Sequence, residues 1–226
     1  MKVLKTFVAI VLMIGATHIM TGLAQTPRGA DQDLLSMTID NLELKASNIH
    51  LLLSELSDQK KIPIGVEVSP QDDLSRKKTI RLQIEHGTLG DALNSIVKQN
   101  PLYTWKIQDE VVNVFPVETK RDPLLRDVLE TKLGKFSIPR GMTRFDLRQT
   151  LGKVPEIKTL LTQHKVVPEN QSFMSRDFVP LGRGYGLEVS NVSVSVLLNQ
   201  VVRESQTKYW IVLRYGDRKQ YFVLNL

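Results

Sequence analysis

Residues 82–105 (LQIEHGTLGDALNSIVKQNPLYTW) return in diverged form as residues 187–210 (LEVSNVSVSVLLNQVVRESQTKYW), 105 positions further along the chain. Each stretch begins with alternating apolar residues, continues with apolar residues at helical spacing, and ends at a tryptophan. These periods predict a strand, a helix and a second strand in both copies. At this constant spacing of 105 residues, substitutions between the two stretches preserve the character of each position, for example aliphatic for aliphatic. This pattern favours an internal duplication over chance similarity.

A complete module results when the flanking patterns are added to the first copy. Apolar residues at helical spacing occupy Ile49–Leu56, and alternating apolar residues occupy Ile64–Val68. After the central helix, two short strands are expected at Tyr103–Ile107 and Val111–Phe115, joined by a tight turn. With an opening strand around Leu42–Leu44, the expected order is β-α-β-β-α-β-β.

The second copy follows the same plan less regularly. Thr88 with Asp91 predicts a capped helix start in the first copy, and Thr143 with Asp146 has the same spacing in the second. A small sheet needs one face covered, and two helices can cover it. We therefore expect an α+β fold of two tandem small βαββαββ-type modules, each a short mixed sheet backed by two helices.

The first residues have the parts of a signal peptide. Lys2 and Lys5 provide a positive start, and an apolar run follows at Phe7–Ile14. Gly22–Ala24 places small residues before a cleavage site, and a spanning helix needs about 20 apolar residues, so cleavage and a periplasmic or secreted location are favoured over a retained anchor. The expected segments are a signal peptide (1–24), a polar leader (25–36), a first module (37–116), a linker with a short helix (117–134) and a second module (135–226).

Composition excludes several classes of protein. The 226 residues contain no cysteine, which excludes a disulfide scaffold, a thiolate metal site and a cysteine nucleophile. Removing residues 1–24 takes away two lysines and no acids, so the formal net charge falls from +6 to +4. This small excess forms no basic stripe of the kind that nucleic-acid-binding proteins carry, so no nucleic-acid partner is expected.

The first module resembles the short N-terminal domain shared by secretins and TonB-dependent receptors, the STN domain. Gly87–Leu93 (GTLGDAL) is the most characteristic part, and the similarity covers about Met37–Pro116, with a diverged second copy after it. The resemblance implies periplasmic protein–protein docking without chemistry, on a secretin, a TonB-dependent receptor or an anti-sigma regulator. No barrel, plug or secretin core follows in the sequence, so we expect a free-standing exported adaptor.

No arrangement typical of catalysis or metal binding is found. The histidines have no partner at ligand spacing, and a Gly-x-Ser-x-Gly elbow is missing. Gly182–Gly186 leads into a strand at Leu187–Val189 rather than into a helix, so it is interpreted as a loop and not as a phosphate site. Trp105 and Trp210 are interpreted as core side chains. We therefore expect no enzyme, no cofactor, and no catalytic, cofactor-binding or metal-binding residue.

Exposed sheet edges offer a physical route to a partner. We expect such edges in Val111–Phe115 and Tyr221–Leu224, with a further contact in the Gly182–Gly186 loop. The candidate partner-contact residues are Val111, Asn113, Phe115, Arg183, Tyr185, Tyr221 and Val223. Two other functions stay open: a self-assembling structural envelope protein that forms oligomers, and an envelope hydrolase with a site between the modules.

Overall fold

The computed structural model describes residues 29–72, 79–169, 178–216 and 219–226. The helices are α1 (Gly29–Leu35), α2 (Ile49–Lys60), α3 (Leu89–Gln99), the 3-10 turn η1 (Glu118–Lys120), α4 (Pro123–Glu130), α5 (Arg144–Gly152), α6 (Pro155–Gln163) and α7 (Val194–Glu204). The strands are β1 (Thr38–Ala46), β2 (Ile64–Glu67), β3 (Ile80–Thr88), β4 (Tyr103–Gln108), β5 (Val111–Pro116), β6 (Lys132–Ile138), β7 (Val166–Pro168), β8 (Leu187–Ser193), β9 (Tyr209–Tyr215) and β10 (Gln220–Asn225). The signal peptide expected at residues 1–24 lies outside the described residues.

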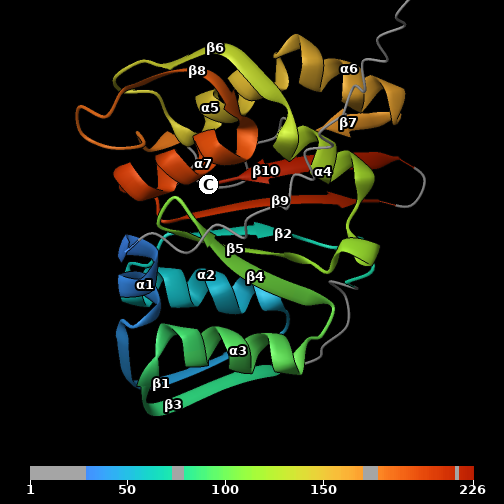
Figure 1. Ribbon diagram of the computed structural model, residues 1–226. Coiled ribbons are helices and arrows are strands. Elements are labelled where there is room, and N and C mark those ends of the chain that lie inside the picture. Colours follow the sequence, from blue (N-terminus) through green and yellow to red (C-terminus); the bar gives the residue numbers. More distant parts are fainter. Residues whose placement is uncertain (1–28, 73–78, 170–177, 217–218) are drawn as a thin grey trace, which may run out of the picture.

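A six-stranded sheet runs through the middle of the molecule in the order β4-β5-β2-β9-β10-β7 (Figure 1). Each half of the chain contributes three of its strands, and parallel pairing of β2 with β9 joins them, with Ile64 opposite Tyr209 and Glu67 opposite Val212. Two-stranded ribbons, β1-β3 and β6-β8, lie at opposite ends of the molecule. The α+β class is confirmed. The expectation of a separate sheet in each module is wrong, because β9 from the second half pairs with the open edge of β2 and joins the strands into one sheet.

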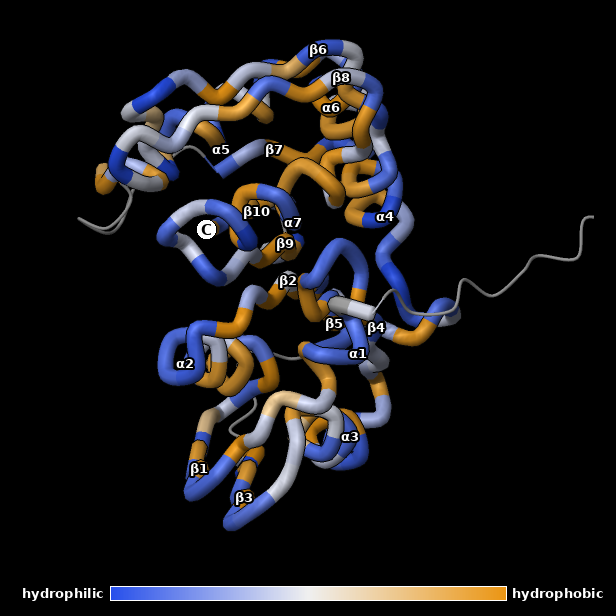
Figure 2. Tube along the Cα trace, turned by 60° about the vertical axis from the view of Figure 1, so that its left-hand side comes forward, coloured by the Kyte–Doolittle hydropathy of each residue, from blue (hydrophilic) through white to orange (hydrophobic). Residues whose placement is uncertain are grey.

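Each half covers one face of the shared sheet. Trp210 and Val212 in β9 pack into a core with α4, α5, α6 and α7, which we call the upper core. Ile211 between them packs into the lower core with α2 and α3. Successive side chains of a strand point to opposite faces, so one strand supplies both cores. The two layers lie above and below the sheet in Figure 1, and Figure 2 shows hydrophobic residues gathered between helices and strands.

The strand order repeats within the sheet. Across the sheet, the two strands of a hairpin lie side by side in each half, and a third strand pairs in parallel with the second strand of that hairpin. This gives the order β4-β5-β2 in one half and β9-β10-β7 in the other. The strands of one half run in the opposite direction to the corresponding strands of the other half, and the helices cover the opposite face of the sheet. The two halves are therefore related by a 180° rotation about an axis that lies in the sheet perpendicular to the strands, combined with a translation along this axis. β4 and β9 are therefore corresponding strands. β9 is covered by β2, whereas β4 is the outer strand of the sheet.

Polar side chains begin the helices where the sequence predicts. Thr88 Oγ1 accepts a hydrogen bond from the Asp91 amide, and the Asp91 carboxylate accepts one of 2.9 Å from the Thr88 amide, which completes a capping box before α3. Hydrogen bonds from Thr88 lower the pKa of Asp91. Thr143 and Asp146 form the same box before α5. Pro123 occupies the first position of α4, as expected for a residue without an N–H.

The polar leader expected at residues 25–36 contains the helix α1. Asp31 Oδ1 accepts a hydrogen bond of 3.2 Å from the Glu110 amide at the tip of the β4-β5 hairpin. Leu34 and Leu35 pack against the lower core. Seven residues with two leucines are too few for a helical period to stand out in the sequence. Among the described helices, none is long and apolar enough to cross a membrane.

Candidate docking site

The junction between the two halves depends on a tryptophan that lies on a glycine. Trp210 in β9 is 2% exposed, which confirms its expected place in the core, and its Nε1 donates a hydrogen bond of 3.0 Å to Asn199 Oδ1 on α7. Gly65 of β2 lies directly opposite in the parallel register. A Cβ atom on Gly65 would overlap the Trp210 ring, so glycine allows β2 to pair closely at this position.

The substitution Gly65→Ala is expected to destabilise the fold by about 1–3 kcal/mol, because the added methyl group forces the Trp210 ring out of its packed position. Gly134→Ala in β6 is the matched control, since a Cβ atom there meets nothing within 4 Å. Urea denaturation followed by far-UV circular dichroism measures both free energies of unfolding. Equal stability of the two variants would contradict the close packing at the junction.

Strand β4 repeats the features of β9, but no described residue pairs with its outer side. Trp105 stands 105 positions before Trp210, and its Nε1 donates a hydrogen bond of 3.3 Å to Asn94 Oδ1 on α3. Trp105 packs against the lower core and is half-buried. The alternation of hydrogen bonds between β4 and β5 directs the backbone groups of Trp105 and Ile107 outward. β4 is thus an edge with polar backbone groups available to a further strand.

Two buried ion pairs attach the segment between the halves to the shared sheet. The Glu67 side chain at the end of β2 is 2% exposed, and it accepts hydrogen bonds from Arg121 Nε and Nη2, the shortest 2.7 Å. Burial raises the pKa of Glu67, and the Arg121 guanidinium opposes that rise. Asp122 caps α4 and lies 2.6 Å from Arg214 Nη2 in β9. Each carboxylate is paired with an arginine, so these four charges hold the connecting segment against the shared sheet.

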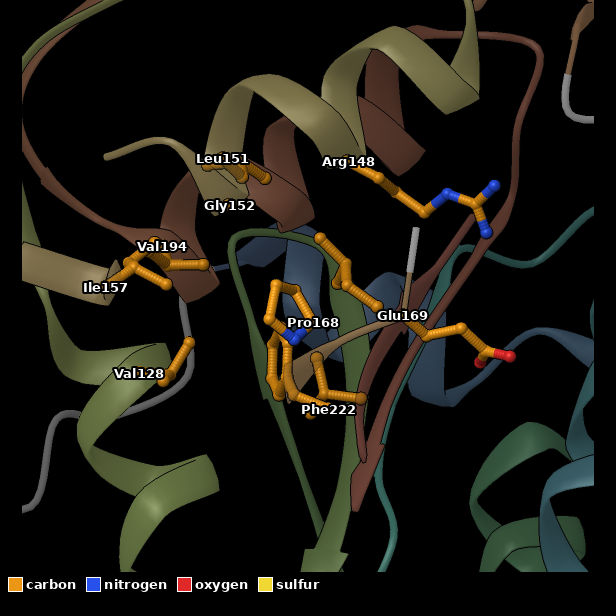
Figure 3. A pocket seen from close by; sticks show the side chains of 11 residues that line it. Val128, Arg148, Leu151, Gly152, Ile157, Pro168, Glu169, Val194 and Phe222 are labelled. Carbon is orange, nitrogen blue, oxygen red and sulfur yellow. The ribbon is translucent and has the colours of Figure 1, made fainter. Parts of the chain in front are cut away.

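The cavity in Figure 3 lies between the sheet and helices α4, α5, α6 and α7. Its volume is about 20 Å³, enough for about one water molecule. Leu151, Ile157 and Phe222 belong to its mainly apolar lining, whereas Arg148 and Glu169 stand at one side with their charged groups directed away from it (Figure 3). A space of this size and polarity is a packing gap of the upper core and not a substrate site.

A second hollow of about 310 Å³ is open to solvent beside this cavity, between α5, α6 and β7. Lys153, Lys158 and Thr162 supply its polar groups, and the Thr162 hydroxyl donates a hydrogen bond to the Lys158 carbonyl. A hydrolase needs a nucleophile beside a base, and the described residues that line the two hollows form no such pair. In the described parts of the chain, no group of histidine, cysteine and acidic side chains could hold a metal ion.

The sheet order corrects the candidate contacts in β5. This strand lies between β4 and β2, so it is an interior strand and not an edge. Val111 is 0% exposed and Asn113 is 8% exposed. Phe115 is half-buried, with Lys106 and Arg121 over its ring. A hairpin pattern in the sequence identifies two paired strands but does not show which of them pairs with a third strand. Here β2 pairs with β5, so β4 is the edge strand.

The expected edge at the second hairpin is also wrong, because β7 pairs with the outer side of β10. Tyr221 and Val223 are half-buried, and the Tyr221 ring stacks on Tyr215 at 5.4 Å. Arg183 is exposed in the loop before β8, whereas Tyr185 packs against the upper core, where burial raises the pKa of its hydroxyl to about 12. β2 and β9 separate β5 from β10, so the structure does not bring the candidates of the two hairpins together.

The residues that sequence reasoning missed lie at the junction and at its counterpart on β4. Glu67 stands in an otherwise apolar strand, which is a signal for a buried charge that needs a partner. In both copies an asparagine stands 11 residues before the tryptophan, and this repeated spacing could have predicted their hydrogen bond. The two pairs are Asn94 with Trp105 and Asn199 with Trp210.

Comparison of the chain with known protein families, with curated proteins and with solved structures found no match. The fold and the site together define an α+β protein whose two halves share one sheet. In the part of the chain that the structure describes, the outer edge of this sheet at β4 is unpaired. This edge of β4 corresponds to the edge of β9 that pairs with β2.

Proposed function

We propose that this protein is an exported, non-enzymatic protein-interaction module that docks on an envelope protein through the edge of β4. The resemblance of Gly87–Leu93 and its surroundings to the STN domain supports periplasmic docking on a secretin, a TonB-dependent receptor or an anti-sigma regulator. The observation that carries the proposal is β4 itself, which offers outward backbone groups and repeats the tryptophan–asparagine pair with which β9 receives β2. Strand addition at such an edge is a common mode of recognition.

The six-stranded sheet of a second copy offers β4 a poor partner strand at its other edge. The other outer strand of the sheet is β7, which has three residues, Val166–Pro168. The Glu169 amide donates a hydrogen bond to the Phe222 carbonyl of β10, so the alternation of the parallel pair directs the backbone of Pro168 outward. Proline has no N–H to donate and protects an edge from pairing, so β7 is poorly suited to β4 of another copy.

Capture from an envelope extract tests the proposal, with residues 25–226 as bait beside the variants Ile107→Pro and Ile107→Ala. Ile107→Pro removes an outward N–H that β4 does not use in pairing with β5. Ile107→Ala removes the same apolar side chain and keeps that N–H, so it is the matched control. We expect one stoichiometric envelope protein with the wild type and with Ile107→Ala, and its loss with Ile107→Pro.

Circular dichroism must first show that both variants are folded. Retention of the same envelope protein by folded Ile107→Pro would contradict docking at β4. Light scattering that finds only multimers of the chain, with no second protein captured, would instead favour the self-assembling structural role.

A further inference from the structure

We propose that β4 takes up a parallel strand from the partner protein, with a glycine opposite Trp105 and an acidic residue opposite Lys106. The inference rests on the docking function proposed above and specifies the chemistry of the segment that docks. It follows from the junction inside the molecule, where β9 holds a strand of this kind in β2.

The junction supplies the register. Gly65 lies opposite Trp210 in a parallel pair, and the residue after Gly65 lies opposite the residue after Trp210. β4 corresponds to β9 through the offset of 105 and through its place in the sheet. The same pairing therefore places one partner residue opposite Trp105 and the next one opposite Lys106.

The requirement for glycine comes from the indole. A Cβ atom opposite Trp210 would overlap its ring. Trp105 is held by a hydrogen bond to Asn94 on α3, as Trp210 is held by a hydrogen bond to Asn199 on α7. Because the indoles of Trp105 and Trp210 are anchored at corresponding positions, we expect Trp105 to overlap a Cβ atom of a strand added to β4, as Trp210 would overlap one at position 65. The partner strand therefore needs a glycine opposite Trp105.

The preference for an acidic residue comes from the charge on the uncovered side of β4. Lys106 is exposed, and its ammonium group lies 5.6 Å from the centre of the Phe115 ring. It forms no ion pair with any residue in the described part of the chain. Opposite charges directly across a strand pair stabilise the pairing, so a carboxylate is the complementary partner group for Lys106.

Helix α3 offers a second contact to the same partner. In the internal junction, Asn199 and Arg203 of α7 donate hydrogen bonds of 3.3 and 3.4 Å to carbonyls at the tip of the β4-β5 hairpin. The corresponding residues of α3 are Asn94 and Lys98, and both are exposed. By analogy, these donors are available to carbonyl groups of a hairpin turn in the partner strand that lies next to the docked strand.

Among the described strands of this chain, none carries a glycine followed by an acidic residue, so a second folded copy does not supply this pattern from the described residues. β2 carries the suitable glycine, but it lies between β5 and β9 in the middle of the sheet. The outer strand β7 has no glycine and directs a proline outward. The inferred occupant is therefore a segment of another protein in which a glycine is followed by an acidic residue.

A synthetic peptide with the sequence of residues 61–69 (KIPIGVEVS) is the probe, because it contains the strand that β9 already binds. Two analogues carry Gly65→Val and Val66→Glu within the peptide. Fluorescence anisotropy of labelled peptides gives their affinities for residues 25–226. A blue shift of Trp105 emission reports contact at β4, because Trp210 is already buried.

We expect the parent peptide to bind, and the Gly65→Val peptide to bind at least about tenfold more weakly. The Val66→Glu peptide is expected to bind about threefold more tightly or better, and this gain should disappear at high salt and in the protein variant Lys106→Gln. The protein variant Ile107→Pro should lose binding, whereas Ile107→Ala should stay within about threefold of the wild type.

Equal affinity of the glycine and valine peptides would overturn the inference, and so would binding that Ile107→Pro leaves unchanged. Failure of every peptide, with Ile107-dependent capture of an envelope protein intact, would overturn the glycine strand alone and leave the docking function in place. Loss of Ile107 dependence in both experiments would overturn both.

Discussion

Replacing Trp210 by alanine is expected to lower the free energy of unfolding by about 3–5 kcal/mol, whereas the same change at Trp105 should cost about 2 kcal/mol or less. Trp210 packs in the upper core and covers Gly65 across the junction. Trp105 is half-buried and has no strand on its outer side among the described residues. The two tryptophans occupy corresponding positions, so the difference between the two losses of unfolding free energy measures the stability that a neighbouring strand contributes at this position.

Urea titrations followed by far-UV circular dichroism give both free energies without depending on tryptophan emission. Each alanine variant also leaves a single tryptophan, so emission then separates the two environments. The protein that keeps Trp210 should emit at shorter wavelength than the protein that keeps Trp105. Equal losses of stability would mean that Trp105 is packed as completely as Trp210, which would remove the open edge on which docking depends.

Features that depend on a few neighbouring residues could be predicted from the sequence. The capping box of Thr88 and Asp91 is confirmed, because such a box acts within one helical turn. The helices α5 and α6 are likewise separated by a local signal, because α5 ends at Gly152 and a proline inside a helix loses a backbone hydrogen bond, so Pro155 begins a new helix. The α+β class followed from these local signals together with the alternation in the strands.

Features that depend on distant residues could not be predicted in the same way. The pattern of Val111–Phe115 indicates a strand, but it does not show that β2 covers this strand and leaves β4 outside. Glu67 and Arg121 are 54 positions apart, and no local pattern pairs them. The single shared sheet and the candidate site on β4 both follow from pairing of this long-range kind, which is why they required the structure.

Arg121→Met is expected to destabilise the protein by about 3–5 kcal/mol, because it leaves the Glu67 carboxylate buried without a counter-charge. Glu67→Leu should cost less, since Arg121 keeps Glu118 at 3.6 Å and Glu130 at 3.9 Å and is partly exposed. The double variant Glu67→Leu/Arg121→Met should recover most of the loss, because apolar side chains then replace the whole pair. Chemical denaturation of the four proteins completes a double-mutant cycle, and additive losses would contradict the coupling of these two charges.

The loss in Arg121→Met should depend on pH, with a sign set by Glu67. Burial raises the folded-state pKa of this carboxyl, and the substitution removes the guanidinium that opposes the rise. Between the ordinary pKa and the raised one, the folded state binds more protons than the unfolded chain, so stability falls as pH increases through that window. Denaturation at about pH 5 and about pH 8 should therefore show the larger loss at the higher pH, and the double variant should not show this difference. A loss that is the same at both values would mean that Glu67 stays ionised and hydrated without Arg121, which is incompatible with a carboxylate buried between the two halves.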